Sequence, residues 1–199
     1  MRINLYFLIV LALCLINASA ETPKASRYIE IHKSKPVEVN GLEFVAAIQA
    51  QWPLVSDIER SREEVQLWIT NRSGHDLAFV PPGQLNLRNA DGTAVPSTGM
   101  RDGTRCPLPI VIRVGDTCCL SIQMEMFWHY HERCFLTYTD DTGFEWTYEP
   151  LKPGHYSLSF SIDASEKDAS MFSKLLGGMA VWSGSVTTKE APFDIIEGG

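Results

Sequence analysis

The sequence has no excess of positive charge, no internal repeat, no low-complexity tract and no apolar run long enough to cross a bilayer. Its 199 residues include 17 Lys and Arg against 24 Asp and Glu, a formal net charge of −7. Nucleic acid and anionic membranes are recognised through clustered positive charge, so both are poor candidates for the principal partner. No catalytic motif stands out among the serines, histidines and carboxylates, and the sequence predicts a protein that is not an enzyme.

The first twenty residues have the composition of a secretory signal. Arg2 supplies a positive charge, Leu5–Ile16 forms an apolar run too short to span a membrane, and Ala18–Ala20 has the small-residue pattern of a cleavage site. We therefore predict a signal peptide over residues 1–20 and an exported protein, periplasmic or secreted, with no membrane span.

A single domain is expected after the signal. Removing residues 1–20 leaves 179 of the 199 residues, which is within the size range of one domain with its own core. Residues 21–35 are polar and carry few packing signals, so we predict an N-terminal arm there. The folded domain is predicted over residues 36–199.

The clearest structural pattern is a strand that follows a turn at Leu151–Tyr156. Tyr156, Leu158, Phe160 and Ile162 alternate with polar residues, which places the four apolar side chains on one face of an extended segment. This two-residue period predicts a half-buried strand. A tyrosine at the start of such a strand can direct its hydroxyl to nearby backbone, as the tyrosine corner of Greek-key sandwiches does.

Similar segments recur at short intervals between turn signals. Strands are predicted at 42–52, 65–70, 117–128, 134–139, 144–148, 181–186 and 192–196. Asn40-Gly41 and Asp91-Gly92 favour tight hairpin turns. Pro96–Pro109 lacks periodicity and is predicted to be a long surface loop, whereas residues 166–177 have the spacing of a short amphipathic helix. Many strands and one helix predict an all-β sandwich rather than alternating βα units.

Five features occur in order along the chain: Ile69–Ser73 at a strand end, Asp91-Gly92, Val114–Asp116, the Leu151–Tyr156 corner and Trp182–Val186. This order resembles that of secreted bacterial immunoglobulin-like domains. Ile69–Gly92 and the corner are also similar to the domain of bacterial intracellular proteinase inhibitors. The resemblance implies an immunoglobulin-like Greek-key β-sandwich and carries over no catalytic or cofactor-binding residues.

Cysteine chemistry is limited to four residues after the signal: Cys106, Cys118, Cys119 and Cys134. An even number in an exported protein suggests disulfides. Cys118 and Cys119 would point to opposite faces of a strand, so a bond between them would be strained. We predict a bridge between Cys118 and Cys134 on the inward face. The alternative is buried free thiols that behave as small apolar side chains.

His129 and His131 are candidate metal ligands. Two histidines separated by one residue on an extended segment project to the same side and can chelate one copper or zinc ion. Met124 and Met126 would add soft sulfur ligands, but on a continuous strand both face inward, away from the histidines, and belong to the core. We therefore expect no cofactor.

Together these observations predict an exported, non-catalytic binding module for protein or cell-surface partners. Recognition is expected on loops or on an exposed sheet face, with Pro96–Pro109 as the first choice. Trp68 lies on the face opposite Val65 and Leu67 and is a candidate aromatic platform. Two alternatives stay open: a protease inhibitor that acts through a surface loop, and a periplasmic copper or zinc binding protein.

Overall fold

The computed structural model describes residues 29–54, 61–81, 84–101, 107–129, 133–140 and 144–197. The predicted signal over 1–20 lies outside these ranges, as do residues 21–28 of the predicted arm. Cys106 and His131 lie outside them too. In the described part of the chain no helix is long and apolar enough to cross a membrane.

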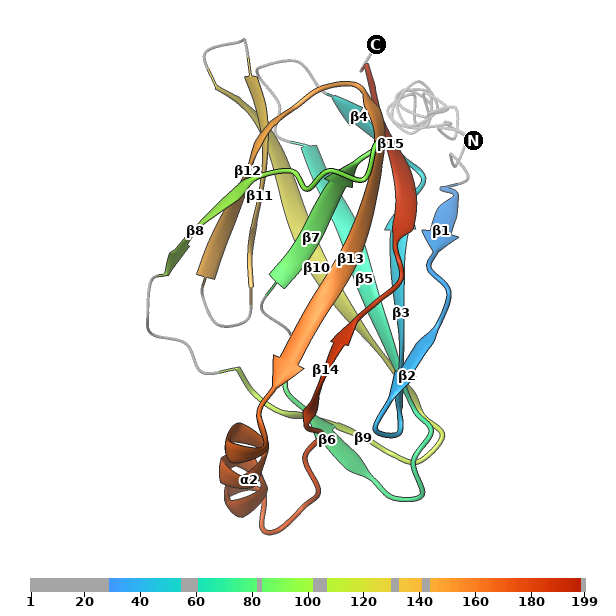
Figure 1. Ribbon diagram of the computed structural model, residues 1–199, viewed down its shortest axis with the longest axis vertical. Coiled ribbons are helices and arrows are strands. Elements are labelled where there is room, and N and C mark those ends of the chain that lie inside the picture. The colour runs from blue at the N-terminus through green and yellow to red at the C-terminus, as the bar shows by residue number, and fades with distance from the viewer. Residues whose placement is uncertain are drawn as a thin grey trace, which may run out of the picture.

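Two β-sheets face each other (Figure 1). The larger sheet has the order β1-β3-β5-β10-β11-β12-β8, with β2 paired to β3, and its neighbours are antiparallel. Its strands are β1 (Ile31–Lys33), β2 (Val37–Val39), β3 (Leu42–Gln49), β5 (Ser61–Asn71), β8 (Ser97–Arg101), β10 (Thr117–His129), β11 (Arg133–Thr139) and β12 (Phe144–Leu151).

The smaller sheet has the order β14-β13-β15-β4. β15 and β14 pair with successive parts of one edge of β13, residues 154–158 and 161–164, and β7 pairs with the opposite edge along 156–161. Its strands are β4 (Gln51–Leu54), β7 (Gln84–Asn89), β13 (Gly154–Ala164), β14 (Gly184–Thr187) and β15 (Ala191–Glu197). β15 and β4 run parallel to each other. A separate ribbon of β6 (Leu77–Phe79) and β9 (Ile110–Ile112) lies at the lower end of the view in Figure 1.

The core lies between the two sheets and is built from alternate residues of the long strands. Val65, Leu67 and Ile69 of β5 are fully buried, and so are Leu158 and Phe160 of β13. Burying a side chain of this size stabilises the fold by about 1.5–3 kcal/mol. The predicted all-β sandwich is confirmed, while its immunoglobulin-like Greek-key type stays a prediction.

Tyr156 forms the predicted corner. Its hydroxyl donates to the carbonyl of Lys152 at 2.9 Å and accepts the N–H of the same residue at 3.2 Å. Its ring packs against Phe193, with 5.8 Å between the ring centroids. Leu151 ends β12 in the larger sheet and Gly154 begins β13 in the smaller one, so these contacts hold the crossing between the sheets.

Two buried tyrosines join the sheets in the middle of the sandwich. The hydroxyl of Tyr138 on β11 accepts the N–H of Leu85 at 2.9 Å, and the hydroxyl of Tyr148 on β12 donates to the carbonyl of Leu85 at 2.7 Å. Burial raises the pKa of both phenols, so both stay protonated. Both backbone groups of one β7 residue are therefore bound to the β11–β12 hairpin.

The tight turn predicted at Asn40-Gly41 is confirmed. Asn40 has a φ of 48° and Gly41 a φ of 79°, the left-handed conformation that a two-residue hairpin between β2 and β3 requires. The Asn40 side chain also donates to the carbonyl of Ser183 at 2.8 Å. The turn is thus tied to the segment that leads into β14.

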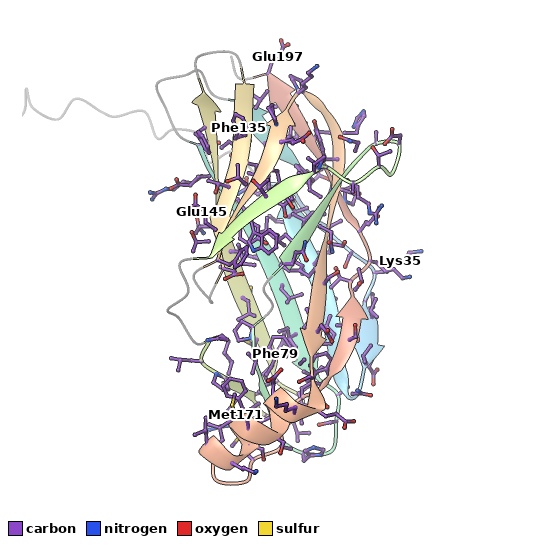
Figure 2. The ribbon with its side chains drawn as sticks, turned by 60° about the vertical axis from the view of Figure 1, so that its left-hand side comes forward. Lys35, Phe79, Phe135, Glu145, Met171 and Glu197 are labelled. Carbon is purple, nitrogen blue, oxygen red and sulfur yellow. The ribbon has the colours of Figure 1, made fainter. Side chains whose placement is uncertain are left out.

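The predicted helix over 166–177 is confirmed and ends slightly earlier, as α2 (Glu166–Leu175). The Ser165 hydroxyl caps its first turn by accepting the N–H of Asp168 at 3.1 Å. Phe172 is buried, whereas Met171 is exposed. Figure 2 shows Met171 on the helix at the lower end of the molecule, so α2 closes one end of the sandwich.

The strand predicted over 42–52 divides between the sheets at Ala50. The N–H of Ala50 donates to the carbonyl of Glu30 beside the larger sheet at 2.8 Å, and its carbonyl accepts the N–H of Asp194 in the smaller sheet at 2.8 Å. The prediction of one continuous strand was wrong because the burial of alternate residues continues through Ile48, Ala50 and Trp52. Periodicity alone therefore does not reveal the change of sheet.

Residues 96–109 are not one long loop. Ser97–Arg101 forms β8, which pairs with β12 at the edge of the larger sheet. Gly99 lies against the ring of Phe144, where a Cβ would come within 2.0 Å of a ring carbon, so this strand position carries no side chain that could add to an alternating pattern. The loop prediction is therefore wrong for residues 97–101, and the first choice for a binding loop contains an edge strand.

Replacing Tyr156 with Phe should destabilise the protein by about 1–2 kcal/mol, because two hydrogen bonds to the Lys152 backbone disappear while the ring stays packed. The free energy of unfolding in urea measures this loss. Lys152→Ala is the matched control, since it keeps the backbone atoms that bind Tyr156 and should change stability by less than about 0.5 kcal/mol. Equal stability of Tyr156→Phe and the wild type would contradict a stabilising role for the corner.

Candidate functional site

β10 extends far beyond its pairing with β11. It has 13 residues and pairs with β5 along Thr117–Met126, whereas β11 pairs only with Glu125–His129. Figure 1 shows the strands diverging below this point, with β10 running to the lower right and β11 staying at the left. Among the described residues, no strand pairs with this edge of β10 from Thr117 to Met124.

The hydrogen bonds between β5 and β10 show which backbone groups of β10 point away from β5, toward the edge without a described partner strand. The N–H of Asn71 donates to the carbonyl of Asp116 at 3.0 Å, and the register places these two residues opposite each other. In an antiparallel ladder, directly opposite residues alternate between bonded and non-bonded pairs. The even-numbered residues of β10 therefore bond to β5, and the N–H and C=O groups of Cys119, Ser121 and Gln123 point to the other edge.

A hollow of about 660 Å³ lies along this edge, and we call it the β10 slot. Its lining combines the unpaired part of β10 with the lower ends of β11 and β12. The lining residues are Arg62, Leu67, Pro81, Cys119, Leu120, Ser121, Ile122, Gln123, Glu125, Thr137, Tyr138, Thr139, Asp140 and Glu145. Pro96–Pro109 was predicted to bind partners, and none of its described residues, 96–101 and 107–109, lines the slot.

The inner wall of the β10 slot is apolar and incompletely covered. Met124 and Met126, on the inward face of β10, are fully buried, which confirms that they are core residues. Leu120 and Ile122 lie on the same face but are only half-buried. The core therefore opens to the slot where β11 leaves β10.

The rim of the β10 slot is acidic. Arg62 donates to Glu125 at 3.1 Å, and Asp140 accepts the N–H of Phe144 at 3.0 Å. Figure 2 shows Glu145 at the margin of the molecule, on the same side as Phe135. Asp140 is buried, only 6% exposed, and its other carboxylate oxygen accepts the indole N–H of Trp146 at 3.2 Å, so it does not belong to the outward margin. Among the described lining residues at that margin, Glu125 and Glu145 stand against Arg62, a formal net charge of −1.

Trp68 is a poor stacking platform. The ammonium of Lys33 lies 4.1 Å from the centroid of its ring and covers it. The indole N–H donates to Gln66 at 2.9 Å, Gln66 donates to Glu64 at 2.8 Å, and Ser121 donates to the same carboxylate. Hydrogen bonds from Gln66 and then Ser121 lower the pKa of Glu64. This face of the sheet is already occupied by a polar network.

The predicted bridge between Cys118 and Cys134 is wrong, because both are free thiols. Cys134 lies opposite Trp128 in the β10–β11 register, and Cys118 lies ten residues earlier on β10. At the rise of an extended strand this separation is about 33 Å, far beyond the reach of a disulfide. Both residues are on the predicted inward face, but at opposite ends of the strand. The alternative of buried free thiols holds for Cys134, which is buried, whereas Cys118 is a free thiol that is only half-buried.

Cys119 should be the most reactive of the described thiols, because it is exposed in the slot while Cys134 is buried. Burial also raises the pKa of Cys134 to about 11, which leaves little thiolate in neutral solution. Alkylation of the folded protein at about pH 8, followed by peptide mass mapping, should label Cys119 first and Cys134 only after unfolding. A peptide cross-linked through Cys118 and Cys134 under non-reducing conditions would contradict this pattern.

The candidate metal ligands lie largely outside the described structure. His131 is outside the described residues, and of His129 only the backbone, opposite Arg133 at the end of β10, is described. Among the side chains that the structure does describe, no group of three or more His, Cys, Asp or Glu residues is close enough to hold a metal ion.

Glu63 is a buried carboxyl that the sequence analysis did not identify. It lies on the inward face of β5, opposite Met124, and is only 5% exposed. Burial raises its pKa to about 7, although a hydrogen bond from Ser61 at 3.3 Å acts in the opposite direction. The predicted strand began at residue 65, and the alternation of Glu63 with Val65 is the signal that could have extended it and shown that Glu63 faces inward.

Glu63→Gln should stabilise the protein increasingly as pH rises from about 4.5 to about 7, and the gain should be constant above that pH. The raised pKa means that the folded state binds a proton that the unfolded state releases, so the wild type loses stability over this range. The pKa difference corresponds to about 3 kcal/mol at most. Urea unfolding across this pH range measures it, and a stability difference that does not vary with pH would contradict the assignment.

Comparison of the chain with protein-family models, with curated proteins and with solved structures finds no match. The resemblance to secreted immunoglobulin-like domains is therefore neither supported nor opposed by these comparisons. The β10 slot, at about 660 Å³, is larger than four other hollows of the described structure, which measure about 220 to 490 Å³.

Proposed function

We propose that this protein is an exported, non-catalytic binding module that recognises a protein partner through the β10 slot. The signal-like residues 1–20 support export to the periplasm or the cell exterior. The acidic composition is in accord with a partner other than nucleic acid.

One observation carries this proposal: the backbone edge of β10 that lacks a neighbouring strand among the described residues. Cys119, Ser121 and Gln123 direct their N–H and C=O groups into a hollow instead of toward a neighbouring strand. An unpaired edge is a template for another chain, and natural proteins usually protect such edges or use them for binding. The half-buried Leu120 and Ile122 beside it offer apolar surface that a partner would cover.

Ser121→Pro tests the proposal, because proline removes one N–H of the free edge without removing a backbone hydrogen bond to β5. The side-chain bond from Ser121 to Glu64 is lost equally in Ser121→Ala. Wild-type and variant proteins are immobilised and exposed to the native envelope fraction. We expect a partner protein to be retained by the wild type and by the matched control Ser121→Ala, which keeps the N–H. Retention by Ser121→Pro should fall at least about tenfold.

Alkylation of Cys119 with a bulky maleimide provides a second test that requires no refolding of a variant. The thiol lines the slot, so the adduct should block binding, and Cys119→Ser treated in the same way should bind normally. Near-ultraviolet circular dichroism establishes that each protein is folded. Equal retention of the partner by wild type, Ser121→Pro and the Cys119 adduct would show that the slot is not the binding site.

A further inference from the structure

The ligand chemistry of the β10 slot can be inferred from its two walls and its rim, and this step rests on the function proposed above. The edge groups of Cys119, Ser121 and Gln123 repeat at every second residue, the spacing of hydrogen bonds in a β-ladder. An extended segment satisfies all of them at once, whereas a helix satisfies its own backbone groups internally and leaves the edge unpaired. The shape of the donor and acceptor row therefore favours a strand.

The length of the edge limits how much of a segment it can bind. From Cys119 to Gln123 the strand rises about 14 Å, and a strand laid beside it would pair with about five residues. Above Gln123 the edge is already taken by β11, which pairs with β10 from Glu125 onward. The bound segment is therefore short.

The two faces of the slot differ in chemistry. In a paired strand, residues opposite Leu120 and Ile122 share their inward face and would contact these half-buried side chains, Pro81 and Leu67. Residues opposite Ser121 and Gln123 would point outward to the polar side. A segment whose apolar and polar residues alternate fits both faces, and a segment with another period does not.

The rim selects the charge of the outward residues. Glu125 and Glu145 face the outward side with one Arg62, whose guanidinium binds Glu125. Lysine or arginine on the outward positions of the segment is attracted by this net negative rim, and glutamate or aspartate is repelled.

We propose that the β10 slot binds a short extended segment of a partner protein in which apolar residues alternate with basic ones. The segment adds a strand to β10, its apolar side chains cover Leu120 and Ile122, and its basic side chains face the acidic rim.

Three seven-residue peptides test this proposal. The first alternates Lys and Val, the second alternates Glu and Val, and the third has the composition of the first with its lysines and valines in separate blocks. Binding to the purified protein is measured by isothermal titration calorimetry at low salt. We expect the Lys/Val peptide to bind at least about tenfold more tightly than either of the others.

Two protein variants show where the peptide binds. Ser121→Pro should abolish binding of the Lys/Val peptide, while Ser121→Ala should retain it. Glu145→Gln should weaken this peptide and strengthen the Glu/Val peptide, because it removes one rim charge without touching the edge backbone. If Ser121→Pro does not fold, the Cys119 adduct replaces it.

Equal binding of the alternating and blocked lysine peptides, or of the lysine and glutamate peptides, would overturn the proposed ligand chemistry. If the envelope partner is nevertheless lost with Ser121→Pro, the proposed function stands and only the ligand class is wrong. If sedimentation shows that the protein associates with itself, and Ser121→Pro prevents this, the slot binds a second copy of the chain and the basic segment is rejected. Insensitivity of both peptide and partner to Ser121→Pro rejects both proposals.

Discussion

The backbone of β10 must find hydrogen-bond partners on two sides, and this demand organises the rest of the larger sheet. β5 satisfies one side along Thr117–Met126, but β11 satisfies the other only from Glu125 onward. A strand of 13 residues beside one of 7 leaves a stretch of edge with which no strand in the described part of the chain pairs. Because exposed backbone can bond to water, this arrangement is stable, yet it keeps the groups available to another chain.

The tyrosines of the β11–β12 hairpin explain why β11 cannot simply follow β10. Tyr138 and Tyr148 bind both backbone groups of Leu85 in the opposite sheet, and their burial makes the loss of either bond costly. The hairpin is thereby held to β7, while β10 remains paired with β5. The β10 slot is the space between two parts of one sheet that are bound to different neighbours, and the same contacts that stabilise the sandwich also open it.

The sequence predicted those features whose cause is local. The corner at Tyr156 depends on a tyrosine four residues after Lys152, and the turn at Asn40-Gly41 depends on residues that tolerate positive φ. The cysteine pairing failed for the opposite reason. Cys118 and Cys134 share an inward face, and a periodic pattern reports the face of a strand but not the distance along it between two residues.

The amino-acid sequence by itself determined the two-residue period of the strands, the inward and outward face of each, and the position of the turns and of α2, because neighbouring residues decide these properties. Only the tertiary structure decided that the chain changes sheet at Ala50, that 97–101 is an edge strand, and that no strand in the described ranges pairs with the second edge of β10 beside Ser121. Backbone N–H and C=O groups are chemically alike at every residue. Which of them find partners is decided by strands distant in sequence, and the candidate site is built on the stretch of β10 whose second edge no described strand pairs with.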